Sequence, residues 1–158
     1  MTLFRAASGI RFANLFLAGL VAGTMFGIWL GYDPRKLSPS AFIEQHQNAV
    51  RALNVTMPAL GAICIVLTII HAYLARFRRS ASNTLLAAAI LFIAAGFITR
   101  FGNQPINATV MTWQADAPPP PGWTDLRDQW WQWHVERTAA GLLGFILVVA
   151  ASVRDERS

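Results

Sequence analysis

Four long apolar runs constrain this chain more than any other feature of its sequence. A helix rises about 1.5 Å per residue, so about 20 residues are needed to cross the hydrocarbon core of a bilayer. Two runs reach this length alone, and two reach it only with polar neighbours. The runs cover residues 10–30, 55–75, 84–99 and 138–153. We therefore expect four spans, over about 10–32, 55–76, 83–102 and 130–153.

The composition agrees with a membrane protein. Of the 158 residues, 54% are hydrophobic and only 13% are charged, whereas soluble domains contain about 25% charged residues. The expected fold class is all-α, a single four-span domain in the form of an integral membrane four-helix bundle. The net charge of +5 does not indicate nucleic-acid binding, because the basic residues stand at the ends of the apolar runs.

Positive charge is unevenly distributed about the expected spans. Seven basic and two acidic residues would lie on the side of both termini, against six basic and six acidic residues on the other side. Arg76, Arg78 and Arg79 crowd into the turn between spans two and three. Because cytoplasmic loops are enriched in Lys and Arg, we expect both termini in the cytoplasm. The expected location is the lipid bilayer of the bacterial inner (cytoplasmic) membrane.

An extra amphipathic helix, over about 39–54, is expected outside the bilayer and leads into span two. Ser38 and Pro39 form a typical helix start. His46 belongs to its apolar stripe, where a polar side chain needs a partner or a role. Pro58 interrupts helical hydrogen bonding and could lean this helix across the mouth of the bundle, which would bring His46 to a site there. An outer loop is expected over about 103–123.

The strongest candidate site lies near the outer boundary of span four. Trp130, His134 and Arg137 are four and three residues apart and share one helical face. A guanidinium can bind an oxyanion, an imidazole can move a proton near neutral pH, and an indole can stack on a planar ligand. The structural alternative is an arginine that snorkels within an interfacial belt of tryptophans.

Other features point to architecture. Cys64 and His71 are expected to pack between helices, with His71 hydrogen-bonded. A stripe of Gly19, Gly23, Gly27 and Gly31 on span one allows a close helix contact, within the chain or in a homo-oligomer. His134 and His46 are the candidate ligands of any metal, but their spacing supports neither a metal site nor heme.

Three stretches carry a resemblance to a known family. They are Gln45-His46-Gln47 followed by Arg51 and Met57-Pro58, then Asn103-Gln104-Pro105-Ile106-Asn107, and then the nine residues from Trp130 to Thr138. In this order between four spans, they resemble the anthrone oxygenase-like family of small four-helix membrane proteins.

The resemblance implies a polar site at one membrane face. It also implies oxidation of a small apolar aromatic substrate, anthrone-like or phenolic, with molecular oxygen as co-substrate. The matching positions are Asn103, Asn107, Trp130, His134 and Arg137. A histidine base and an arginine for the developing oxyanion suit this reaction. We accordingly expect His134 and Arg137 to be catalytic, and the two asparagines, Trp130 and His46 to bind substrate.

Two other functions compete with this monooxygenase-type enzyme. A non-catalytic scaffold, accessory subunit or lipid-binding protein would pair His134 and Arg137 with Glu136, Asp128 or backbone groups and would have no cavity. A transporter is disfavoured by the small size of the chain and by the absence of a broken helix at mid-bilayer.

Overall fold

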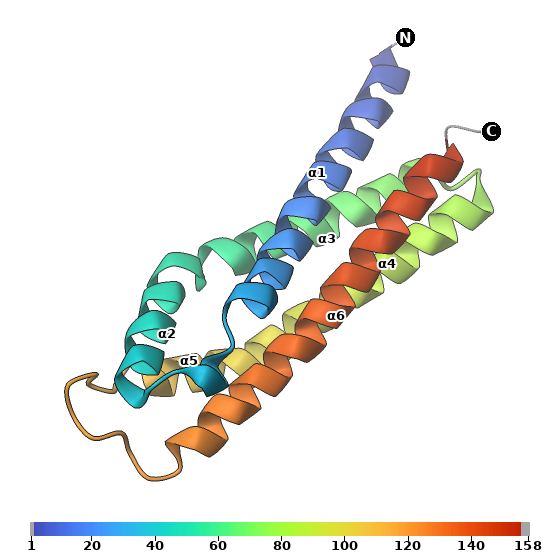
Figure 1. Cartoon of the computed structure of the whole chain (residues 1–158). Helices are drawn as coiled ribbons and strands as arrows, with labels where there is room; N and C mark the ends of the chain where they lie inside the picture. The colour runs from blue at the N-terminus through green and yellow to red at the C-terminus, as the bar shows by residue number, and fades with distance from the viewer. Residues whose placement is uncertain (1, 156–158) are drawn as a thin grey trace.

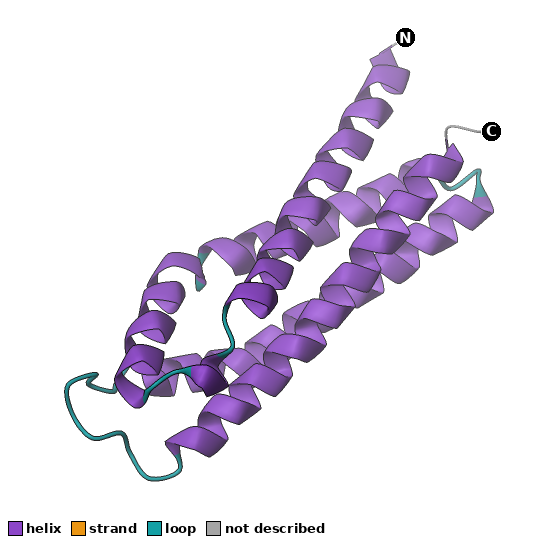
Figure 2. Ribbon diagram, in the orientation of Figure 1, coloured by secondary structure: helices purple, strands orange, loops and turns teal. Residues whose placement is uncertain are grey.

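The computed structural model describes residues 2–155 and is all-helical over that range (Figure 2). Glu156 and Arg157, which entered the charge count, lie outside the described residues. The α-helices are α1 (Thr2–Gly31), α2 (Pro39–Leu53), α3 (Thr56–Leu74), α4 (Arg79–Ile98), α5 (Gln104–Val110) and α6 (Trp123–Asp155). A short 3-10 helix, η1 (Pro34–Lys36), follows α1, and a π-helical turn, η2 (Thr99–Asn103), joins α4 to α5.

The described residues contain four helical stretches long and apolar enough to cross a membrane, which confirms the expected fold class. They are Ala7–Lys36, Thr56–Leu74, Arg79–Val110 and Trp123–Arg154. The start of α1 and the end of α6 lie at one end of the bundle, and α2, α5 and the long loop lie at the other (Figure 1). The outward surface is strongly apolar, with Phe12, Leu30 and Ile90 each about two-thirds exposed or more, as expected of helices that face lipid.

Small and polar side chains join the spans near the end that holds the termini. Ala18, Ala88 and Ala151 are buried and allow close helix contact. The buried Asn14 of α1 makes hydrogen bonds to two residues of α3, at 2.8 Å from Thr68 Oγ1 and at 3.1 Å from His71 Nδ1. The prediction that His71 is a hydrogen-bonded packing residue is therefore confirmed.

The chain bends between α2 and α3, at Asn54 and Val55. Pro58 lies in the first turn of α3 and has no N–H to donate to the carbonyl of Asn54, so a continuous helix would lack that bond. The α2 helix consequently leans away from α3 and packs against α5 (Figure 1). This geometry brings His46, which is 1% exposed, into the protein interior.

The predicted outer loop over 103–123 was wrong for its first part, because Gln104–Val110 forms α5. Pro105 lacks the N–H that an α-helix would direct at residue 101, and the preceding residues wind into the wider π turn instead. Gly102 allows this turn to touch α6, since a Cβ there would lie 2.6 Å from Trp133 Cγ.

The glycine stripe on α1 is mostly open. A Cβ added at Gly19 would meet Phe145 at 3.5 Å, whereas additions at Gly23, Gly27 and Gly31 would have no described atom within 4 Å. Within the described chain, the stripe therefore leaves its outer three positions uncovered.

Candidate active site

A cavity of about 470 Å³ lies at the end of the bundle covered by α2 and α5. This volume falls within the usual range of small-molecule sites, about 300–1,000 Å³. Its walls are mostly apolar, with Met25, Ile28 and Phe92 among them. The polar lining groups come from residues distant in sequence, and they are Tyr32, Gln45, His46, Asn54, Thr99, Arg100, Gln104, Asn107, Trp130 and Arg137. The cavity contains no Asp or Glu in its lining.

Asn107 of α5 connects three elements at this cavity. Its Oδ1 lies 2.8 Å from the Trp130 indole Nε1 and 3.1 Å from His46 Nε2, and its Nδ2 donates to Asn54 Oδ1 at 3.3 Å. An indole nitrogen can only donate, which identifies the atom facing Trp130 as the amide oxygen. The sequence-predicted residues His46, Asn107 and Trp130 thus form one hydrogen-bonded group.

The same bonds define the protonation state of His46. Because Asn107 Oδ1 is an acceptor, His46 Nε2 donates to it and carries the ring proton. The Nδ1 lone pair makes no hydrogen bond with the described residues. Burial lowers the pKa of His46 to about 4, an effect that the Asn107 hydrogen bond opposes and the charge of Arg137 reinforces. His46 is therefore a neutral imidazole with a free Nδ1 at neutral pH.

Arg137 and His134 form a second polar pair, on α6. The guanidinium approaches His134 Nδ1 with Nε at 3.0 Å and Nη2 at 2.8 Å, and its Nη1 lies 3.5 Å from Thr99 Oγ1. Arginine has no acceptor, so His134 Nδ1 must contribute a lone pair and the ring proton must be on Nε2. That Nε2 is buried, and the imidazole also interacts with the backbone of Met25 on α1.

Arg137 faces the cavity without a carboxylate partner in the described chain. The scaffold hypothesis named Asp128 and Glu136 as acidic partners of His134 and Arg137, but both acids interact with other residues. Asp128 pairs with Arg127 at 2.8 Å, and Glu136 accepts a bond from Gln132 at 3.4 Å. A partly buried cation among apolar walls favours an anionic oxygen as its missing partner.

Trp130 is a wall residue that contacts both histidines. His134 stacks on its indole at 5.2 Å with the ring planes 1° apart, and His46 approaches at 4.9 Å in an edge arrangement. The indole is 6% exposed. One of its faces is thus covered by His134, and its N–H is committed to Asn107.

Two of the sequence-predicted residues do not line the cavity. His134 is 0% exposed and lies behind Arg137. Asn103 is also fully buried and donates to the Trp130 carbonyl at 3.0 Å, joining η2 to α6. The structure therefore gives both residues contacts that support the cavity wall.

Several lining residues were missed by sequence reasoning. Tyr32 packs edge-on against Trp130 at 5.8 Å, and its buried hydroxyl has no partner among the described residues. Asn54 occupies the bend, and Thr99 belongs to the π turn. The only sequence signal for Tyr32 is its place at the outer end of span one.

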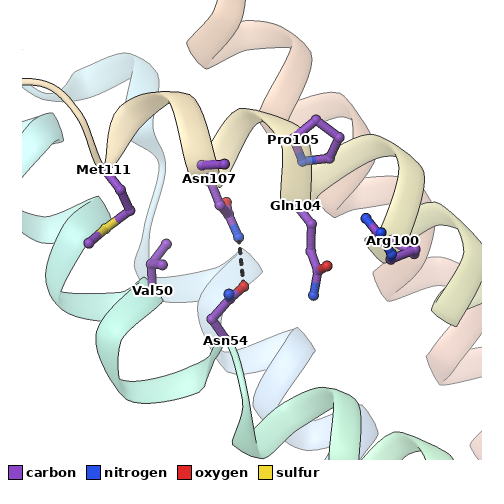
Figure 3. Close-up of a pocket in the computed structure, with 8 residues that line it drawn as sticks. Val50, Asn54, Arg100, Gln104, Pro105, Asn107 and Met111 are labelled. Carbon is purple, nitrogen blue, oxygen red and sulfur yellow. Dashed lines mark hydrogen bonds between the residues drawn. The ribbon is translucent and has the colours of Figure 1, made fainter.

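A smaller outer pocket of about 430 Å³ adjoins the cavity (Figure 3). The two share the residues Val50, Asn54, Arg100, Gln104 and Asn107. Pro105, Ala108 and Met111 complete the outer pocket. It lies between the α2–α3 bend and the η2–α5 segment, with the Asn54–Asn107 hydrogen bond between the two (Figure 3).

The described residues contain no group of three or more His, Cys, Asp or Glu that could hold a metal ion. His46 and His134, the histidines singled out from the sequence, both contact Trp130, but they hydrogen-bond to different partners.

Comparison with known proteins identifies a family for this chain. No curated protein and no solved structure gives a significant match to the chain. A family model described as anthrone oxygenase matches residues 47–147. This range contains the α2–α3 bend, the π turn and the Trp130–Arg137 face. Since the match covers more than half of the sequence, the chain belongs to the anthrone oxygenase family.

Proposed function

We propose that this protein oxidises a flat, electron-rich polycyclic phenol of the anthrone type to its quinone, using molecular oxygen. The observation that carries the proposal is Arg137, a cation without a carboxylate partner in the described chain, in the wall of an apolar cavity that His46 also lines. Family membership supports an oxygenase-like activity.

The reaction balances with oxygen as the oxidant. The methylene carbon of the anthrone loses two hydrogens and gains one oxygen atom as a carbonyl, and the second oxygen atom leaves as water. The first step is removal of a proton from the methylene carbon, which leaves an electron-rich enolate. The enolate transfers electrons to oxygen, and a carbon–oxygen bond forms before water is lost.

We assign the base to His46 in preference to His134. The His46 Nδ1 lone pair is free of bonds to described residues, whereas Arg137 occupies Nδ1 of His134. After His46 accepts a proton, its Nε2–H still donates to Asn107, which holds the imidazolium in place. An oxyanion beside Arg137 would offset the charge that lowers the His46 pKa and would strengthen the base when substrate is bound.

Arg137 would stabilise the negative charge that develops on the substrate oxygen. Its hydrogen bonds to His134 orient the guanidinium before substrate arrives, and such pre-oriented donors are effective where water is excluded. His134 then acts as a positioning residue. A site at one end of four spans suits a poorly soluble substrate, and we propose the outer face of the bacterial inner membrane, with both termini in the cytoplasm.

Oxygen uptake tests the proposal. Protein in lipid nanodiscs is mixed with anthrone, and uptake is compared with empty nanodiscs, because anthrones react slowly with oxygen unaided. Arg137→Gln should lower the catalysed rate by about 100- to 1,000-fold, the usual effect of losing an oxyanion donor. Arg51→Gln is the matched control, since Arg51 is exposed on α2 and its side-chain bonds with described residues go to Asn48 and Gln47, outside the cavity lining. Uptake no faster than with empty nanodiscs would overturn the proposal.

A further inference from the structure

A second arginine lines the same cavity and is not used by the proposed reaction. Arg100 borders both the cavity and the outer pocket. Its guanidinium lies 5.9 Å from the ring of Phe101 and makes no ion pair within the described residues. The cavity therefore has two cationic groups and no acidic lining residue.

The π turn places Arg137 beside the residue that precedes Arg100. Arg137 Nη1 lies 3.5 Å from the hydroxyl of Thr99, and Arg100 is the next residue in η2. Arg137 faces the cavity from α6, whereas Arg100 is exposed and belongs to the outer pocket as well. Arg100 thus borders both pockets, whereas Arg137 borders the cavity alone.

Amide groups surround Arg100 in the outer pocket. Gln104 extends from the start of α5 toward the α2–α3 bend (Figure 3). Asn54 Oδ1 already accepts a bond from Asn107, so its NH₂ group remains available as a donor. The pocket combines a guanidinium and amide N–H donors with the apolar surfaces of Val50, Pro105 and Met111.

We propose that the outer pocket binds a carboxylate carried by the substrate, so that the substrate is an aromatic acid with a phenolic oxygen at its other end. This inference rests on the proposed function, since it assumes that the phenolic end lies at Arg137. A carboxylate can accept two bonds from Arg100 and others from Asn54 and Gln104. The apolar side chains fit the aromatic rings between the two polar ends.

The acidic headgroup of a phospholipid has related chemistry and could also contact Arg100. The shared wall favours the substrate, because Arg100 lines both the outer pocket and the cavity of about 470 Å³ that Arg137 also lines. Measurements in nanodiscs of zwitterionic lipid, repeated with anionic lipid, separate the two sources. If the outer pocket binds a substrate carboxylate, the protein will bind a carboxylic acid probe more tightly than its ester in zwitterionic lipid. If anionic lipid is the true ligand, the acid and the ester will bind equally in zwitterionic lipid.

Three probes test the inference: a dihydroxyanthraquinone, its monocarboxylic acid and the methyl ester of that acid. Binding is measured by titration calorimetry in zwitterionic nanodiscs. The wild-type protein should bind the acid more tightly than the ester or the parent. Arg100→Gln should weaken binding of the acid about tenfold, as expected for a charge-assisted hydrogen bond, and leave the other two unchanged. Arg137→Gln should weaken all three, and the control Arg51→Gln should weaken none.

The outcomes separate this inference from the proposed function. If the wild-type protein binds the three probes equally, or Arg100→Gln weakens them all alike, the carboxylate site is refuted and the cavity assignment stands. If the wild-type protein binds none of the probes, the proposed function fails and the inference fails with it. A thermal unfolding curve of Arg100→Gln that matches wild type excludes misfolding as a cause, as expected for an exposed side chain.

Discussion

The guanidinium of Arg137 directs two of its nitrogen atoms at one atom of His134, with Nε at 3.0 Å and Nη2 at 2.8 Å from Nδ1. This contact makes His134 an acceptor at Nδ1 and removes the lone pair that a base would use. The spacing that suggested a histidine base beside an arginine therefore also lets the arginine donate hydrogen bonds to that histidine.

Substitution of His134 distinguishes a positioning residue from a base. His134→Gln retains an oxygen that can accept from Arg137, so we expect it to keep most of the oxygenase activity. His134→Leu leaves two donors unpaired and should lower the free energy of unfolding by about 1–3 kcal/mol, together with activity. Oxygen uptake and thermal unfolding measure the two effects. A His134→Gln variant as inactive as His46→Gln would instead identify His134 as the base.

The stability of the protein should depend on pH through His46. Its pKa is about 4 in the folded protein, because of burial, against 6.5 for the free side chain. The unfolded chain therefore binds a proton more readily, and this contribution to stability is complete above pH 6.5 and is lost as the pH falls toward 4. Thermal unfolding of wild type and His46→Gln between these limits measures it. Equal slopes for the two proteins would contradict the prediction.

Asn107 should affect the rate through the orientation of His46. Asn107→Leu removes the acceptor of both the His46 and Trp130 protons. We expect kcat for anthrone oxidation to fall about 10- to 100-fold, as when a catalytic group is misplaced, with a smaller change in KM. Asn48→Leu is the control, because Asn48 is exposed on α2 and its side chain hydrogen-bonds, within the described part of the chain, to Arg51 alone. A change in KM alone would argue for a direct role in substrate binding.

The packing of the π turn on α6 makes Gly102 sensitive to substitution. In Gly102→Ala the new Cβ would lie 2.6 Å from Trp133 Cγ, and we expect a loss of about 1–3 kcal/mol in unfolding free energy. Gly23→Ala meets no described atom within 4 Å. It should be neutral or stabilising, since alanine is the better helix former by up to about 1 kcal/mol. Denaturation in detergent compares the two, and equal losses would show that packing at Trp133 is not the cause.

The spans and much of the site followed from periodicity and hydrophobicity. The four-span fold was predictable because each span must satisfy its own backbone hydrogen bonds in lipid. The Trp130–Arg137 face followed from helical spacing. His46 was found because a polar residue on an apolar stripe needs a partner, which the structure identifies as Asn107.

Other features depend on contacts between distant segments. The hydrogen-bond partner of His134 depends on the direction of its side chain, which spacing does not give. Spacing alone was consistent with a functional and with a structural role for His134 and Arg137. The π turn depends on Pro105 and on the contact of Gly102 with Trp133, and the latter joins two separate spans. Tyr32 belongs to the site only because α1 ends beside α6, which no local pattern records.

The outer pocket lies along the flank of a spanning segment, since Arg100, Gln104 and Ala108 all belong to the stretch Arg79–Val110. A lipophilic substrate that entered the outer pocket from this flank would leave the hydrocarbon phase directly and would not need to dissolve in the surrounding water. The concentration that matters to the cavity is then the mole fraction of substrate in the lipid, which is set by its partition coefficient. An apparent KM expressed per volume of buffer will rise as lipid is added, and the same KM expressed per mole of lipid will stay constant.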